Sequence, residues 1–171
     1  MPGVETYSDY RFTCLLDTCL LIDTPFRLGY SGEAKAFLAF IMRQTADLTN
    51  DSGDPVGVMY PIRGDEVPAE EELPHLRGYL DSQPVRIGNR ARDQLQLDTF
   101  AHVLEAFFYF RHTGGKIDRA KRELIDRLID TLLERWSEPD TGVLATPERR
   151  LYPFGTVMAW CGLATGAALA P

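Results

Sequence analysis

The sequence has 171 residues, of which 44% are hydrophobic and 25% are charged, and its formal net charge is −7. The length fits one domain spanning residues 1–171, and the composition excludes a disordered chain. The acidic balance argues against nucleic acid and membrane surfaces as partners. We expect a cytoplasmic protein, because the N-terminus has no signal-peptide pattern and no apolar run could span a bilayer.

Two helices are predicted in the first third of the chain. Apolar residues recur over 9–24, and Pro25 should kink or end that helix, because proline cannot donate a backbone hydrogen bond and clashes with the preceding turn. Ser31 is a suitable N-cap for a second helix that runs to Leu48. We therefore expect a pair of antiparallel helices joined by a short turn.

The middle of the chain is predicted to contain little helix. Residues 56–62 are apolar and interrupted by Gly57 and Pro61, which favours a brief strand or an extended loop. Residues 63–90 are rich in proline, glycine and acidic residues and should form a long loop. Loops of this length are uncommon in compact domains and are often functional, so this segment is a candidate for binding.

Helices return in the second half. Apolar side chains cover nearly every face of residues 91–112, which predicts a buried helix. Residues 117–136 are amphipathic, and a last helix is expected over 154–169 after a loop. Buried and amphipathic helices in alternation suit an inner and an outer ring, so we predict an all-α fold of antiparallel helical hairpins.

Polar side chains gather where the long loop meets the third helix. Residues 84–89 read PVRIGN and residues 94–98 read QLQLD. Amide, carboxylate and guanidinium groups all form hydrogen bonds with sugar hydroxyls. The candidate substrate-binding residues here are Arg86, Asn89, Gln94 and Asp98. The alternative, which we favour, is that Asn89 caps the third helix and the others brace the loop, because that support is needed with or without a ligand.

Several short motifs follow one another along the chain: SDYRF at 8–12, LLD at 15–17, RLGYSGEAKAFL at 27–38, the 84–98 segment, WSEPDTG at 136–142 and VMAW at 157–160. In their sequence and order they resemble glycoside hydrolase family 15, the glucoamylase and trehalase group. The resemblance implies a partial (α/α)6 toroid, of which this chain would form less than half. It also implies an ancestral inverting hydrolysis of an α-glucosidic bond in trehalose or a glucan, without a cofactor.

The same resemblance shows where the chain departs from the family. The motif that supplies the general acid in the family ends in Trp-Glu, but here it reads Leu144-Ala145. Glu148 is a weak substitute, because the neighbouring arginines would keep it ionised. Of the arginine and aspartate that bind glucose in the family, the first is Leu16 here and the second remains as Asp17. Asp17 as a sugar ligand and Asp17 as a structural helix residue are equally supported.

These observations leave several functions open. We expect a truncated, catalytically impaired glycoside hydrolase module that lacks the part with the general base. A second hypothesis is a non-catalytic helical interaction module, with a homo-oligomer or a complementing C-terminal half as its partner. A third is a protein that binds a small glucoside or glucan. A metal site is not expected, because the three histidines are scattered without ligand spacing.

Overall fold

The computed structural model describes residues 8–45, 53–63, 66–143, 145–146 and 148–170, apart from the side chain of Asp23. It is mostly helical, with two small antiparallel sheets, which confirms the predicted all-α class. The helices are α1 (Leu15–Leu28), α2 (Ser31–Thr45), α3 (Leu97–His112), α4 (Arg119–Arg135) and α5 (Pro153–Leu169). The strands are β1 (Thr13–Cys14), β2 (Met59–Tyr60), β3 (Glu71–Glu72) and β4 (Arg86–Ile87), and two 3₁₀ turns are η1 (Tyr79–Asp81) and η2 (Arg90–Asp93).

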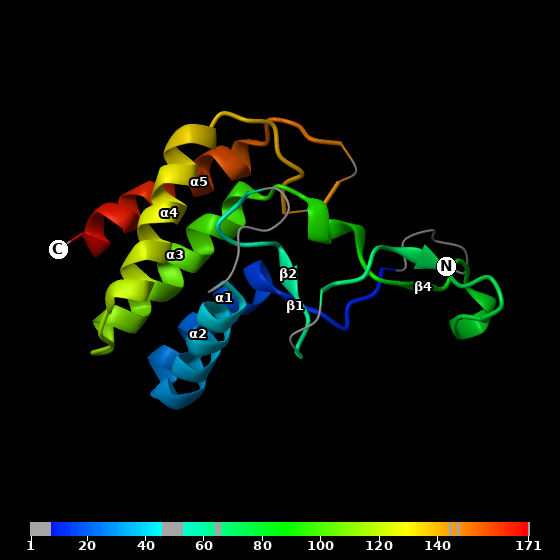
Figure 1. The fold of residues 1–171 in the computed structure, drawn as a ribbon, viewed down its shortest axis with the longest axis horizontal. Coiled ribbons are helices and arrows are strands. Elements are labelled where there is room, and N and C mark those ends of the chain that lie inside the picture. Colours follow the sequence, from blue (N-terminus) through cyan, green and yellow to red (C-terminus); the bar gives the residue numbers. More distant parts are fainter. Residues whose placement is uncertain (1–7, 46–52, 64–65, 144, 147, 171) are drawn as a thin grey trace.

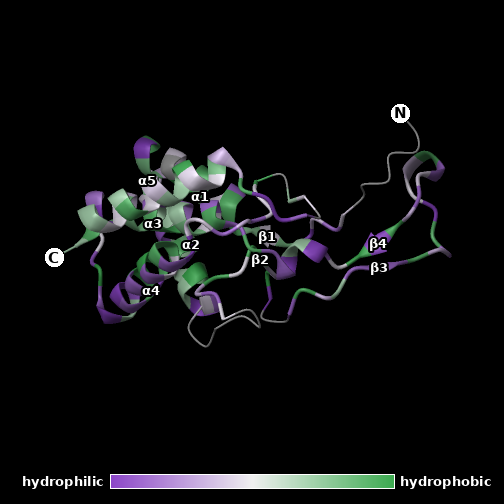
Figure 2. Ribbon diagram, turned by 90° about the horizontal axis from the view of Figure 1, so that it is seen from above, coloured by the Kyte–Doolittle hydropathy of each residue, from purple (hydrophilic) through white to green (hydrophobic). Residues whose placement is uncertain are grey.

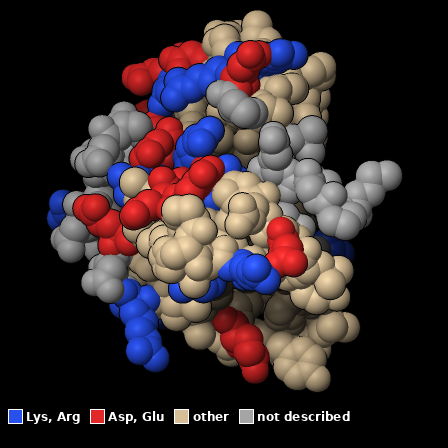
Figure 3. Space-filling view, turned by 90° about the vertical axis from the view of Figure 1, so that its right-hand side faces the viewer, with Lys and Arg blue, Asp and Glu red and all other residues tan. Residues whose placement is uncertain are grey.

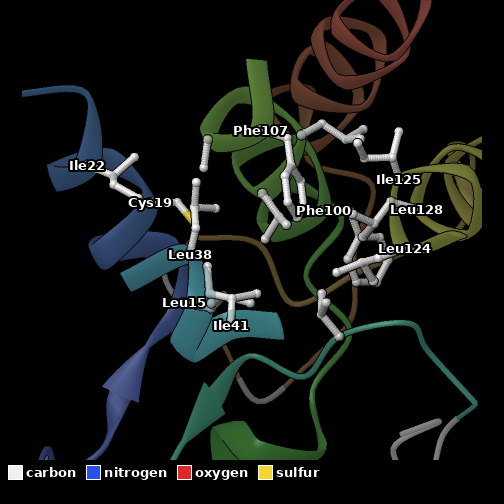
Figure 4. Packing of buried hydrophobic residues seen from close by; sticks show 14 of the residues in the cluster. Leu15, Cys19, Ile22, Leu38, Ile41, Phe100, Phe107, Leu124, Ile125 and Leu128 are labelled. Carbon is white, nitrogen blue, oxygen red and sulfur yellow. The ribbon is translucent and has the colours of Figure 1, made fainter. Parts of the chain in front are cut away.

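Helix α3 is the centre of the helical body. It packs against α1, α2, α4 and α5, while α1 also contacts α2 and α4 also contacts α5 (Figure 1). The core between them is aliphatic and aromatic, and Phe107 of α3 has no exposed surface (Figure 4). A central helix with apolar side chains on most faces is the arrangement that its sequence predicts.

The start of α1 differs from the sequence prediction. Residues 9–14 are not helical, because Thr13 and Cys14 pair with Tyr60 and Met59 in an antiparallel ladder. Pro25 does not end the helix but lies in its last turn. The helix continues to Leu28 and stops at Gly29, whose φ of 85° is the left-handed conformation that glycine adopts readily.

The long loop is also more ordered than predicted. Strands β3 and β4 pair antiparallel, with Glu72 opposite Arg86, and form an arm that projects away from the helices (Figures 1 and 2). We call residues 66–88 the arm. Arg86 forms ion pairs with Glu70 (3.6 Å) and Glu72 (2.8 Å), and Arg90 also pairs with Glu70 (3.1 Å). On the face from which the arm projects, basic and acidic side chains are interspersed (Figure 3).

Helix α3 begins later than predicted, because a 3₁₀ turn comes first. Asn89 caps that turn by accepting a hydrogen bond from Ala91 N (2.9 Å), so it does not cap the helix itself. The backbone is extended at Gln94 and Gln96 before α3 starts. Helices α4 and α5 lie within one or two residues of their predicted bounds. None of the helices in the described part of the chain is long and apolar enough to cross a membrane.

Candidate functional site

The candidate site lies where the segment before α3 meets the turn after α4. Thr141 binds the carbonyl of Leu95 twice, through its amide (3.1 Å) and its hydroxyl (2.9 Å). Asp140 accepts a hydrogen bond from the amide of Leu97 (3.2 Å). Two motifs more than forty residues apart in sequence, QLQLD and PDTG, are therefore adjacent in space.

Gln94 and Ala145 are brought together at this junction, and we call these two residues the rim. The side-chain amide of Gln94 donates to the carbonyl of Ala145 (3.2 Å), and Gln96 donates to the side-chain oxygen of Gln94 (3.1 Å). Ala145 is exposed and has a φ of 49°, a left-handed conformation that costs a non-glycine residue roughly 1–2 kcal/mol. Its side chain is a methyl group, which cannot donate a proton.

The other residues that the sequence singled out have different surroundings. Glu148 is exposed and pairs with Arg150 at 2.6 Å, and Leu144 lies outside the described residues. Asp17 is exposed in the first turn of α1, where its carboxylate interacts with the Cys14 thiol. Leu16, at the position of the family's arginine, is buried in the core. The start of α1 therefore has an exposed carboxylate at position 17 but no cation at position 16.

Asn89 and Arg86 both have structural partners. The Asn89 side chain donates to the carbonyl of Asp9 (2.9 Å), and Arg86 is engaged by the arm glutamates. Asp9 is itself buried: it accepts from the amide of Gly88 (3.1 Å) and forms a two-pronged ion pair with Arg11. These hydrogen bonds with Arg11 hold the pKa of Asp9 below its usual value. The contacts suit the bracing interpretation, and a sugar-binding role for either residue stays a prediction.

Asp98 is the most buried of the predicted residues. It has no exposed surface, and burial, followed by the nearby charge of Asp140, raises its pKa. Burial also raises the pKa of Asp140. Sequence reasoning missed Asp9 and Asp140 as buried acids. The signal was present only as an Asp-x-Arg pattern at 9–11 and an aspartate in a turn at 140, and both are common on surfaces.

In the described part of the chain, no three histidine, cysteine or acidic side chains are grouped as metal ligands.

Comparison with known proteins decides the family. Residues 2–171 match the pattern of Glycosyl hydrolases family 15. The chain belongs to this family.

The family members most similar to this chain include several trehalases. A trehalase of Mycobacterium tuberculosis is 32% identical over 170 residues, covering 99% of this chain and 25% of the trehalase. A trehalase of Thermoplasma volcanium is 30% identical over 98% of this chain and 26% of its own length. Trehalase 1 of Sulfolobus acidocaldarius is 30% identical over 91% of this chain and 28% of its own length. This family 15 chain thus spans about a quarter of the length of these relatives, and no solved structure matches it significantly.

Proposed function

We propose that this chain is a trehalase-like family 15 module that forms one wall of an α-glucoside site but is catalytically impaired as it stands. The observation that carries the proposal is Ala145. The motif that supplies the general acid in the family is present up to Gly142, and the hydrogen bond from Gln94 fixes the backbone of Ala145 at the rim. Beyond Gly142 the motif departs from the family, with Leu144 in place of its tryptophan and Ala145 in place of the glutamate that carries the carboxyl group.

Inversion at a glucosidic bond uses two carboxyl groups about 6.5–9.5 Å apart, one as acid and one as base. Removing a general acid typically slows the reaction by roughly 10²–10⁴-fold. Exposed Glu148 is engaged with Arg150, and buried Asp98 has no surface from which to reach a substrate. In this arrangement neither side chain supplies the missing proton donor.

The test is a chimera in which this chain replaces the matching segment of the Mycobacterium tuberculosis trehalase. We expect it to fold but to hydrolyse trehalose at least about 10²-fold more slowly than the unchanged trehalase. Ala145→Glu in the chimera should restore much of the rate, whereas the matched control Ala145→Gln should not. The contrary result is robust trehalose hydrolysis by the chimera with Ala145 unchanged, provided that Asp17→Ala abolishes this activity. It would show that another residue donates the proton.

Sugar binding without chemistry is part of the same proposal and can be measured on the chain alone. Asp17 and Gln94 are polar side chains at or near the surface that the proposal places on the sugar-facing wall. Titration with trehalose and maltose should shift the amide NMR signals of Asp17 and of residues 86–98 in a saturable way. If neither sugar shifts these signals, the chain does not bind glucosides by itself.

A second candidate function, a helical interaction module, is supported by α5. Its sequence contains no charged residue, yet Phe154, Val157 and Trp160 are exposed, Trp160 to 69%. A helix that is apolar all round is normally buried, so such a face usually has a partner. We expect self-association that Trp160→Glu weakens. A monomer at every concentration in analytical ultracentrifugation would exclude self-association.

A further inference from the structure

Two buried aspartates meet at the first turn of α3. Asp98 has no exposed surface and Asp140 is almost fully buried. Asp140 accepts a hydrogen bond from the amide of Leu97, and Asp98 accepts one from the amide of Thr99 (3.0 Å) through Oδ1. Among the residues that the structure describes, nothing forms a hydrogen bond with Oδ2 of Asp98 or with the hydroxyl of Thr99.

Another buried aspartate, Asp9, shows which partners an ionised carboxylate has in this molecule. Asp9 has both carboxylate oxygens bound by the guanidinium of Arg11, and it also accepts from the amide of Gly88. Asp98 accepts only from backbone amides at the start of its own helix, its Oδ2 has no partner among the described residues, and a second acid is its neighbour. Burying an unpartnered negative charge costs far more than burying an unpartnered neutral hydroxyl.

The charged groups around the pair do not supply a counter-ion for Asp98. On α3 itself His102 favours the ionised form, but it is engaged with Glu105 at 2.8 Å. Beyond the pair, Arg149 acts on Asp140. Helices α1, α2, α4 and α5 pack against α3. The charged side chains of α1 and α2 that the structure describes are exposed, and α5 has no charged residue. Arg135 at the end of α4 pairs with Asp54 and Glu138. The exposed groups are Asp17 and Arg27 of α1, and Glu33, Lys35 and Arg43 of α2.

We propose that Asp98 and Asp140 form a buried acid pair that holds one proton at neutral pH, with Asp98 as the protonated member. The pair acts as a pH-sensitive latch between the start of α3 and the Asp140–Gly142 turn. In mild acid Asp98 is protonated and neutral, and the junction is tight. As the pH rises, ionisation of Asp98 places a second negative charge beside Asp140 and loosens the junction. This inference does not depend on the proposed glycosidase function.

The sign of the effect on stability follows from linkage. The pKa of Asp98 is raised on folding, so the folded chain keeps a proton that the unfolded chain releases once the pH passes the ordinary aspartate value near 3.8. Stability is therefore lost as the pH rises from that value and levels off above the folded pKa. Each unit of pKa elevation lowers the folding equilibrium constant tenfold at high pH.

The test uses the full 171-residue chain. Asp98→Asn is nearly the same shape as the protonated acid, and we expect it to raise the urea midpoint at pH 7 but not at pH 3.5. The matched control Asp9→Asn should do the opposite at pH 7, because it removes an ion-paired carboxylate. A carbon-detected NMR titration of the aspartate carboxyl groups should show Asp98 titrating well above the others, and Asp140→Asn should lower its midpoint.

Two results would overturn the proposal. One is an Asp98 carboxyl signal that titrates at or below the ordinary aspartate value. The other is an Asp98→Asn variant that folds but is less stable than the unchanged chain at pH 7. If Asp98→Asn does not fold, the titration of the unchanged chain decides the question alone, with the signal assigned through its own Cβ.

Discussion

Replacing Gly162 with alanine puts a methyl group into the contact between α5 and α3. The new Cβ would lie 2.9 Å from Cβ and 3.0 Å from Cα of Ala101, and 2.8 Å from Cδ1 of Leu132. The end of a leucine can rotate away, but both atoms of Ala101 are fixed to the α3 backbone. The two helices would have to move apart along a contact that organises the whole body.

The magnitude follows from two opposing terms. Overpacking a filled core costs about 1–3 kcal/mol, and a clash with backbone belongs in the upper half of that range. Alanine in place of glycine inside a helix stabilises the folded state by about 1 kcal/mol, because alanine has the higher helix propensity. The net expectation is a loss of about 1–2 kcal/mol in the free energy of unfolding, which corresponds to roughly 2–8 °C in Tm for a chain of this size.

Gly166→Ala is the matched control in the same helix. The three atoms nearest to its Cβ would all belong to Ile129, with Cδ1 and Cγ1 both at 2.7 Å, and this side chain can change its rotamer. The propensity gain should then offset most of the cost. Urea unfolding followed by far-UV circular dichroism measures both variants. If Gly162→Ala is as stable as Gly166→Ala or more stable, α5 does not cross α3 at Ala101 as described.

Three other changes test separate contacts. Asn89→Ala should lower the free energy of unfolding in urea by about 2–3 kcal/mol, because it leaves the buried amide of Ala91 and the carbonyl of Asp9 unpaired. A loss below about 0.5 kcal/mol would contradict these hydrogen bonds. Asp118→Ala should lower the free energy of unfolding by about 1 kcal/mol, because the Asp118 side chain accepts a hydrogen bond from Lys121 N at the start of α4. The same loss for Asp126→Ala on the exposed face would rule out capping as the cause. Burial raises the pKa of the Cys19 thiol, so iodoacetamide should spare it in the folded chain and modify it in urea; rapid labelling of folded Cys19 would refute its burial.

The elements that the sequence predicted well are those whose signals are local. The charged and apolar faces of α4 repeat along the helix, and Asp118 marks its start. Helix α5 begins one residue from its predicted start, with Pro153 in the first turn, where proline lacks no needed hydrogen bond. In both cases the information lies within about one turn of the helix end.

The errors arose where distant contacts decide the structure. Thr13 and Cys14 have a helical neighbourhood in sequence, but pairing with Met59 and Tyr60 holds them as a strand. The arm was predicted as a loop because β3 and β4 are each two residues long and depend on pairing and on the ion pairs of Arg86. A periodicity argument cannot detect strands of that length.

The candidate site divides in the same way. Its residue types and the substitution at Ala145 are visible in the sequence, because they rest on motifs. The junction is not, since Gln94 and Ala145 are 51 residues apart and nothing local indicates that they touch. The motifs QLQLD and PDTG bind each other through backbone groups and the side chains of Asp140 and Thr141, and these contacts do not involve the side chain at position 145. This explains how the junction can form with alanine at position 145. It is also why Ala145→Glu should place a carboxyl group at the rim without rebuilding the fold.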